Sequence, residues 1–349
     1  MSNLAERLQP FWAADIMYGE SALFNGDSID HELRAPLCFA PLEILTVTST
    51  ARGITYREGR DWRLDGNDLV RPVGSTMPAL TTSALTPAKG SQAYDLSRRD
   101  GSGEILFGAC HEYHDVQVEV TYRFQPGQWR GPQPAFAEQQ LPNVLTALRE
   151  RRQLSITVFG DSISTGANAS GWAKVAPFQP SYTDLLAERL RLAYGAQVTL
   201  GNQSVSGQTS AWGLDHVQAV AETKPDLAIL AWGMNDGNAP GTEPDAFSHN
   251  LRAQITAIRA TSPRTDCILV AGMLPNDEWQ SVVPGLLMSY RAELLCLAGP
   301  GVAVADVSGV WAELLTRKRH LDLSGNGVNH PNDFAHRIYA QVVSALLIR

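Results

Sequence analysis

From residue 155 to the end of the chain, short apolar segments alternate with longer segments of helical periodicity. Short apolar segments bounded by turn residues are typical of buried strands. Strands that alternate with helices form a parallel sheet with helices on both faces. We therefore expect strands at 155–159, 197–200, 226–232, 267–271 and 301–306, and helices at 181–194, 210–223, 245–261, 286–297 and 333–348.

The first 125 residues show a different pattern, in which turn signals separate short extended segments and no helical stretch stands out. Residues 116–124 alternate apolar and polar side chains with period two, as in a half-buried strand. Residues 65–68 (DGND) predict a tight turn, and 42–48 and 68–72 are further strand candidates. This pattern predicts a small all-β sandwich.

A change of composition separates these two parts. Residues 125–134 contain three prolines and two glycines, which favours a linker, and a helix is expected at about 142–152. A chain of 349 residues is long enough for two domains. We predict an N-terminal β-sandwich domain at 1–130, a linker with a connecting helix at 131–153, and an α/β domain at 154–349.

Four short polar segments of the α/β part carry residue types that can do chemistry. Three follow expected strands and the fourth precedes the last helix, so a parallel sheet would gather them at its carboxyl edge. Together they offer a nucleophile, a base and two kinds of oxyanion donor, which is what acyl transfer through a serine requires. The segments are Gly160-Asp161-Ser162-Ile163, Ser206-Gly207-Gln208-Thr209, Gly233-Met234-Asn235-Asp236 and Asn329-His330-Pro331-Asn332.

Ser162 and His330 are the expected nucleophile and base. Ser162 stands at a strand-to-helix turn, although a serine there is often only a helix N-cap. A free hydroxyl needs a base, and neutral imidazole accepts a proton near neutral pH. His336, on the expected final helix, is better explained by packing, and His216 is a weak rival.

Gly207 and Asn235 are the candidate oxyanion donors. A glycine lets substrate approach its main-chain N–H closely, and an asparagine side chain supplies a second N–H donor. Both residue types are also common in turns that carry no chemistry. Asp236 is expected to tie down its loop by hydrogen bonds rather than to react.

These four segments, in this order, resemble the SGNH (GDSL-like) hydrolase superfamily, and the resemblance covers about residues 154–349. It implies a flavodoxin-like three-layer α/β/α fold with a five-stranded parallel sheet. It also implies that Ser162 is the nucleophile, that Gly207 and Asn235 are oxyanion donors beside the Ser162 main-chain N–H, and that His330 is the base. The whole layout is similar to that of two-domain carbohydrate acetylesterases with an N-terminal β-sandwich.

One position departs from the pattern of that superfamily. The family usually carries an aspartate three residues before the histidine, where this chain has Gly327. Asn326 or Asp322 could orient the imidazole instead if the loop is longer by a residue. A main-chain carbonyl could also accept from the ring, which would leave a Ser–His dyad.

Aromatic residues and two glycosylation-type sequences lie near the same segments. Trp212 and Trp232 adjoin the motif residues and could line an acyl or sugar pocket, although aromatic residues are more often core. Residues 168–170 (NAS) and 202–204 (NQS) fit the glycosylation pattern. Because they flank the expected site in a chain with no visible leader, we interpret them as chance matches.

Charge and hydropathy bear on partners and location. The formal net charge of −8 argues against a nucleic acid or an anionic membrane as partner. No run of 18 apolar residues is present, and the N-terminal sequence lacks a basic segment followed by an apolar one, so we expect a cytoplasmic protein. The histidines at 111 and 114 (HEYH) would point to opposite faces of an extended strand and could not bind one metal ion together. We therefore expect no metal and no cofactor.

We therefore expect a serine esterase that removes short acyl groups, such as acetyl, from a small-molecule or carbohydrate ester. A lysophospholipase or thioesterase with a longer acyl pocket is one alternative, but no long apolar lid segment supports it. A degenerate hydrolase domain that binds sugar without cleaving it is the other. The complete set of Ser162, Gly207, Asn235 and His330 argues against that reading.

Overall fold

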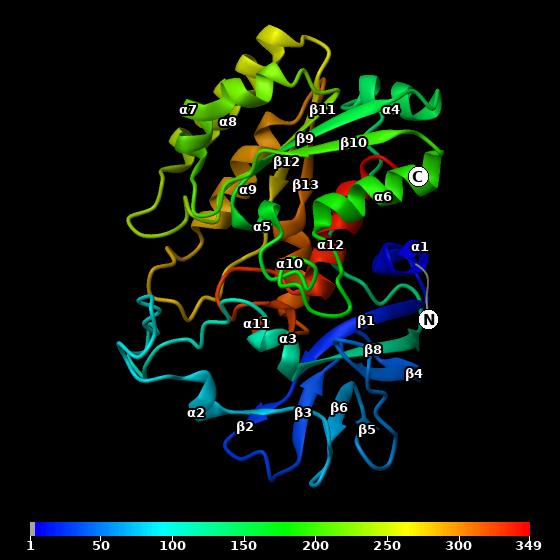
Figure 1. Cartoon of the computed structure of the whole chain (residues 1–349), viewed down its shortest axis with the longest axis vertical. Helices are drawn as coiled ribbons and strands as arrows, with labels where there is room; N and C mark the ends of the chain where they lie inside the picture. Colours follow the sequence, from blue (N-terminus) through cyan, green and yellow to red (C-terminus); the bar gives the residue numbers. More distant parts are fainter. Residues whose placement is uncertain (1–3) are drawn as a thin grey trace.

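The strands expected after residue 154 form one parallel sheet in the computed structural model, which describes residues 4–349 (Figure 1). The strand order is β10-β9-β11-β12-β13. The chain thus leaves β9 to one side and then crosses to the other, and this reversal is where open α/β sheets bind ligands. The strands are β9 (Leu154–Gly160), β10 (Val198–Asn202), β11 (Leu227–Ala231), β12 (Asp266–Ala271) and β13 (Val302–Asp306).

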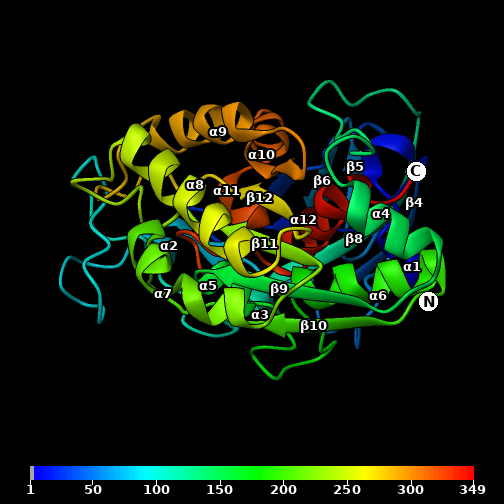
Figure 2. The ribbon, with the colours of Figure 1, turned by 90° about the horizontal axis from the view of Figure 1, so that it is seen from above.

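Helices cover both faces of this sheet, as predicted. Helices α7, α8 and α9 pack side by side on one face, and α6 packs with α12 on the other (Figure 2). The apolar stripe of α6, with Leu185, Leu186 and Leu190, is fully buried. The helices are α6 (Tyr182–Tyr194), α7 (Ser210–Glu222), α8 (Pro244–Thr261), α9 (Leu286–Leu297) and α12 (Asp333–Ala345), with α10 (Val307–Leu315) and α11 (His320–Leu323) between β13 and α12.

The N-terminal part is the expected all-β region, built mainly from antiparallel strands. One sheet has the order β1-β8-β4 and a second the order β3-β6-β5, while β2 and β7 form a short parallel pair. The turn predicted at 65–68 joins β5 to β6, and Gly66 takes a φ of +61° there. The strands are β1 (Ile16–Leu23), β2 (Asn25–Gly26), β3 (Leu33–Pro36), β4 (Pro41–Ser49), β5 (Arg63–Asp65), β6 (Asp68–Arg71), β7 (Leu80–Thr81) and β8 (Gln117–Phe124).

The expectation that this region has no helix is wrong in detail. It contains α1 (Leu4–Arg7), a 3₁₀ turn at Phe11–Ala13, α2 (Thr82–Leu85) and α3 (Glu112–Val116). Segments this short cannot show a helical periodicity in the sequence. Residues 111–114 are therefore not an extended strand, and the His114 ring hydrogen-bonds the Ala176 carbonyl at 2.8 Å.

Among residues 4–349, no group of three or more histidine, cysteine, aspartate or glutamate side chains is arranged to hold a metal ion. No helix in the same range is long and apolar enough to cross a membrane. The helix expected near 142–152 is α4 (Pro142–Arg149).

The β region and the parallel-sheet region are in extensive contact. They share one continuous cluster of buried apolar side chains. Two buried ion pairs also join them, Glu20 with Lys318 at 2.8 Å and Glu119 with Arg337 at 3.4 Å. A long segment of the β region, drawn in cyan in Figure 1, reaches the loop after β12, where the main-chain N–H of Arg99 donates to the Glu278 carbonyl at 2.7 Å.

Candidate active site

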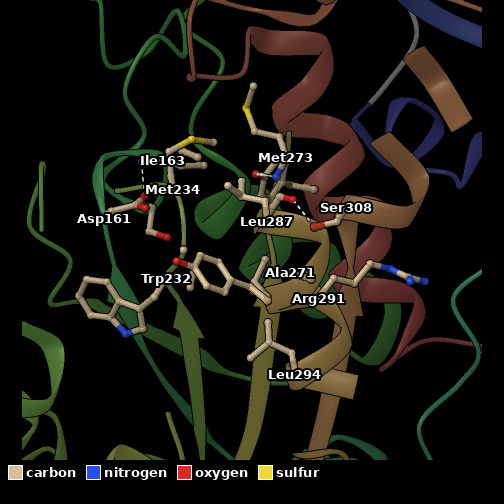
Figure 3. Close-up of a pocket in the computed structure, with 17 residues that line it drawn as sticks. Asp161, Ile163, Trp232, Met234, Ala271, Met273, Leu287, Arg291, Leu294 and Ser308 are labelled. Atoms are coloured by element: carbon tan, nitrogen blue, oxygen red, sulfur yellow. Dashed lines mark hydrogen bonds between the residues drawn. The ribbon is translucent and has the colours of Figure 1, made fainter. Parts of the chain in front are cut away.

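Ser162 lies directly beyond the carboxyl end of β9, as the first residue of α5 (Ser162–Thr165). The turn before it is tight, because a Cβ on Gly160 would stand 2.5 Å from the Ala231 carbonyl oxygen of β11. The Asp161 carboxylate caps the helix by accepting from the Ile163 N–H at 3.0 Å, a contact that Figure 3 draws as a dashed line. The Ser162 hydroxyl is thereby held 2.8 Å from Nε2 of His330.

His330 lies in the loop between α11 and α12, and burial lowers the pKa of its ring to about 4. The ring is therefore neutral near neutral pH and can accept the Ser162 proton. The two rival histidines lie elsewhere. His336 is buried on α12 between the Tyr182 N–H and the Ala167 carbonyl, and His216 bonds the Trp212 carbonyl at 2.8 Å.

The other ring nitrogen of His330 faces Asn168, a residue that the sequence did not identify. Nδ1 lies 2.7 Å from Oδ1 of Asn168. The Asn168 Nδ2 donates to the carbonyls of Gly108, Cys110 and Gly325 at 3.0, 2.9 and 3.1 Å, which fixes which end of the amide is oxygen. Since an amide oxygen only accepts, Nδ1 carries the ring hydrogen and the Nε2 lone pair faces Ser162.

Neither residue proposed to orient the ring does so. Asn326 Oδ1 accepts from the main-chain N–H groups of Val328, Asn329 and His330 at 2.9, 2.9 and 3.0 Å, so it folds the histidine loop. Asp322 is fully buried beside Arg319 at 2.9 Å and accepts from the Leu23 N–H of β1. Both side chains are thus committed to other contacts, and Asn168 takes the place next to the ring.

Asn168 is 5% exposed and lies in the left-handed region with φ +63°, which asparagine tolerates better than most residues. The burial of this amide agrees with the interpretation of residues 168–170 as a chance glycosylation match. The only local signal for this contact was the position of Asn168 just after α5, the short helix that begins at the candidate nucleophile Ser162. Its partners are 58 and 157 positions away in the sequence, at Cys110 and Gly325.

The two oxyanion candidates lie on neighbouring loops. Gly207 has φ +79°, a conformation that favours glycine. Within residues 4–349, the main-chain N–H groups of Ser162 and Gly207 donate to no protein acceptor. Asn235 uses one Nδ2 hydrogen on the Gln208 carbonyl at 2.8 Å, which leaves the other hydrogen for a ligand.

Asp236 holds these loops together, as expected. Its carboxylate accepts from the Ser210 N–H at 3.0 and 3.1 Å, at the start of α7, and so anchors the helix that follows the Gly207 loop. The Tyr290 hydroxyl donates to the Asp236 carbonyl at 2.9 Å and fixes the main chain. The oxyanion candidates are therefore preorganised by contacts between loops.

All four predicted site residues open into one cleft with a cavity volume of about 460 Å³. Its aromatic walls differ from those expected, because Trp212 and Trp232 do not line it. Trp232 is buried, with its Nε1 donating to Gln254 of α8 at 3.0 Å. The aromatic residues of the cleft are Tyr94, Phe107, Trp172 and Trp279, and the polar ones beside the four site residues are Asp95, Asn168, Ser206, Asn238 and Asn329.

Residues 158–338, more than half of the chain, match the sequence model of the GDSL-like Lipase/Acylhydrolase family. The protein belongs to this family. The match includes Ser162, Gly207, Asn235 and His330, and the parallel-sheet region that carries them has the three-layer fold that the resemblance implied.

Solved structures with similar backbones include several esterases. A two-domain esterase active on acetylated mannans is 18% identical with a TM-score of 0.48, over 60% of this chain and 54% of that one. The chain thus spans about half the length of that protein. A carbohydrate esterase family 3 protein from Talaromyces cellulolyticus is 16% identical with a TM-score of 0.43, over 54% of this chain and 94% of that one. A search of curated proteins found no match.

A second, smaller cavity lies beside the same edge of the sheet and encloses about 30 Å³ (Figure 3). It is formed by the ends of β9, β11 and β12 and by α9, with Asp161, Trp232 and Met234 among its lining residues. Burial raises the pKa of Asp161 to about 7, and the nearby charge of Asp236 acts in the same direction. The N-cap of α5 is therefore a carboxyl that titrates near neutral pH.

Proposed function

We propose that this acylhydrolase is a serine esterase that cleaves short acyl esters, acetyl above all, from a carbohydrate. The observation that carries the proposal is the 2.8 Å contact between the Ser162 hydroxyl and Nε2 of His330, in a cleft that Gly207 and Asn235 also line. Ester hydrolysis through an acyl-enzyme needs a nucleophile, a histidine whose unprotonated nitrogen faces that nucleophile, and oxyanion donors.

The reaction follows from these positions. His330 Nε2 takes the proton as the Ser162 oxygen attacks the ester carbonyl carbon. The negative charge that forms on the carbonyl oxygen is stabilised by the N–H groups of Ser162, Gly207 and Asn235. The alcohol leaves with the proton from His330, and water then repeats the sequence to release the acid and restore the serine.

The lining of the site favours a carbohydrate ester. The apolar cavity beside Asp161 encloses about 30 Å³, room for roughly one water molecule, and none of Ser162, Gly207, Asn235 and His330 lines it, so it provides no space for a long acyl chain. The main cleft is instead open and lined by aromatic and amide side chains. Tyr94 and Trp172 are 61% and 45% exposed there, and aromatic faces beside hydrogen-bonding groups suit the apolar and hydroxyl-bearing surfaces of a sugar.

Active-site labelling and turnover test the proposal together. A fluorophosphonate should label the wild type and fail to label Ser162→Ala, whose kcat on an acetyl ester should fall by a factor on the order of 10⁴. Ser206→Ala is the matched control, because Ser206 lines the same cleft without contacting His330. Full activity in Ser162→Ala would show that another residue is the nucleophile.

A series of p-nitrophenyl esters from acetyl to decanoyl and a panel of acetylated sugars then define the substrate class. We expect kcat/KM to be highest for acetyl and acetylated sugars to be deacetylated. A preference for decanoyl would instead support the lysophospholipase or thioesterase alternative. Absence of turnover and of labelling in the wild type would favour the sugar-binding alternative.

A further inference from the structure

We infer that Asn168 is the positioning residue that sets the tautomer of His330, and that a segment of the N-terminal β region, residues 106–113, holds Asn168 in place. The inference rests on the proposed function, because it concerns how His330 acts as the base for Ser162. It makes the β region a working part of the catalytic apparatus rather than a neighbour of it.

The Asn168 amide has a double role. Its oxygen accepts from His330 Nδ1 at 2.7 Å, and its nitrogen donates to three main-chain carbonyls. Two of these carbonyls, on Gly108 and Cys110, belong to the β region, and the third, on Gly325, belongs to the histidine loop. The β region therefore fixes the amide that in turn fixes the imidazole.

Residues 106–113 of the β region pack closely against the histidine loop. A Cβ on Gly108 would stand 2.7 Å from the Tyr113 ring and 3.2 Å from the Gly325 carbonyl oxygen. A Cβ on Gly325 would stand 2.6 Å from Cβ of Asn168. The Gly108 N–H also donates to the Asn326 carbonyl at 3.1 Å. Glycines on both sides thus permit the approach that brings the carbonyls onto Asn168.

The space around Gly327 is closed to the aspartate side chain that is usual at this position. At Gly327, φ is +81° and a Cβ would collide with the Tyr113 hydroxyl and stand 2.6 Å from the Leu106 carbonyl oxygen. The β region thus fills the space that an aspartate side chain would need. A carboxylate in place of Asn168 would meet three carbonyl oxygens with no hydrogen to give them, whereas a carboxamide has two.

The consequence for catalysis is specific. A neutral amide keeps the hydrogen on Nδ1, so that Nε2 can accept from Ser162, but it adds no negative charge beside the imidazolium. The oxyanion donors must then provide a larger share of the rate. Without the Asn168 side chain, the His330 ring should adopt both neutral tautomers. In the tautomer with hydrogen on Nε2, that nitrogen cannot accept the Ser162 proton.

Asn168→Gly tests the amide, because glycine adopts the φ of +63° without strain and removes the whole side chain. We expect kcat on an acetyl ester to fall about 100-fold while KM changes less than about threefold. In long-range proton–nitrogen NMR spectra at pH 7, the His330 ring, assigned by comparison with His330→Gln, should lose the pattern of a protonated Nδ1 and a free Nε2.

Ser170→Ala is the control for loss of buried hydrogen bonds in the same loop. The Ser170 hydroxyl donates to Asp333 at 2.7 Å and does not contact His330. This variant should be less stable than the wild type but keep kcat within a few-fold and keep the His330 ring pattern. An Asn168→Gly enzyme with wild-type kcat and an unchanged ring pattern would overturn the inference, even if it were destabilised.

Gly108→Ala tests the part played by the β region without touching any residue near the reacting atoms. The added methyl group should push residues 106–113 away from Asn168 and lower kcat at least about tenfold, with the same change in the ring spectrum. Gly53→Ala is the matched control, since a Cβ there meets nothing within 4 Å. If Gly108→Ala, confirmed as folded by circular dichroism, keeps wild-type kcat, the β region does not position the site.

The two levels of hypothesis fail in different ways. If Ser162→Ala keeps its turnover, the proposed function is wrong and these variants say nothing of a serine mechanism. If Ser162→Ala and His330→Ala are inactive while Asn168→Gly and Gly108→Ala turn over like the wild type, the esterase stands and only the positioning role is lost.

Discussion

The parallel-sheet region and the N-terminal β region contribute to the site in different ways. The sheet region supplies every atom proposed to react or to stabilise charge, from loops at the carboxyl edge around β9. The β region supplies main-chain carbonyls behind the histidine and side chains such as Tyr94 and Phe107 on the cleft wall. We thus propose that the sheet region carries the reacting groups, and that the β region positions the histidine and forms part of the cleft wall.

This difference shows that a chemical motif can be local while its geometry is not. His330 contacts both Ser162 and Asn168, and Asn168 in turn contacts Gly108 of the β region. A buried ion pair between Glu119 of β8 and Arg337 of α12 links the two regions where they are in contact. Variants in each region test whether the two contributions are separate, from the largest expected effect to the smallest.

The largest effect is expected at the buried charge cluster between the regions. Burial alone would raise the pKa of Glu119, but the charge of Arg337 and the hydrogen bond from Arg52 lower it to about 2. Glu119→Gln leaves buried arginines without their counter-charge, so the free energy of unfolding should fall by about 3 to 5 kcal/mol. Urea denaturation measures it.

Glu32→Gln is the control, because Glu32 pairs with Arg34 and Arg63 at the surface of the same region. It should leave the denaturation curve almost unchanged. If the two regions unfold independently, Glu119→Gln should split the transition into two steps. A single transition displaced as a whole would show that the β region and the sheet region form one cooperative unit.

Much of the sheet region could be predicted from the sequence, because its signals are local. Buried parallel strands are short apolar segments, and all five were expected within about two residues of their ends. The meeting of the four polar segments at one edge follows from the rule that such sheets bind ligands beyond the carboxyl ends of their strands. Ser162 and His330 meet as that rule predicts.

What could not be predicted depends on contacts between distant segments. Asn168 has no motif of its own, and its role becomes visible only beside the carbonyls of Gly108 and Cys110. The cleft aromatics were misassigned for a similar reason. Trp232 was expected as the last residue of a strand but lies just after β11, and its side chain turns toward Gln254 of α8. Trp279 instead lines the cleft from the loop after β12.

The next effect is confined to the sheet region and depends on pH. The Asp161 carboxyl is protonated in the folded state up to about pH 7 but ionises near 3.8 when unfolded, so its stabilising contribution is present below pH 3.8 and is lost as pH rises to 7. Asp161→Asn keeps an oxygen to cap Ile163 and never ionises. The difference in unfolding free energy, variant minus wild type, should grow by a few kcal/mol at most between pH 4 and 8.

Denaturation at several pH values measures this difference. Asp245→Asn, at an exposed position in the first turn of α8, is the control and should show a much smaller change. A difference for Asp161→Asn that does not vary between pH 4 and 8 would mean that the folded protein keeps this carboxyl ionised throughout.

The pH dependence of turnover reports the pKa of His330 beside its neutral amide partner. Because burial lowers the pKa of His330 to about 4, and because its partner is a neutral amide, the base should stay unprotonated well into acid. The value of kcat/KM for an acetyl ester should be nearly constant from pH 7 to 5 and should reach half near pH 4. Circular dichroism at each pH separates this from unfolding, and a midpoint near 6.5 would contradict it.

The smallest effect should come from the cleft wall that the β region supplies. Tyr94 is 61% exposed and packs edge-on against Phe107, with ring centroids 5.3 Å apart, so it offers its surface to a ligand without supporting the core. Tyr94→Ala should raise KM for an acetylated sugar several-fold, leave kcat unchanged, and leave p-nitrophenyl acetate hydrolysis unaffected, because p-nitrophenyl acetate lacks the sugar ring that we propose packs on Tyr94. Ile54→Ala, a 56% exposed position of the same region outside the cleft, should change neither substrate. If Tyr94→Ala slows both esters equally, the β region acts on the reacting atoms themselves at this position too, and its contribution to the outer surface cannot be separated from its contribution to alignment.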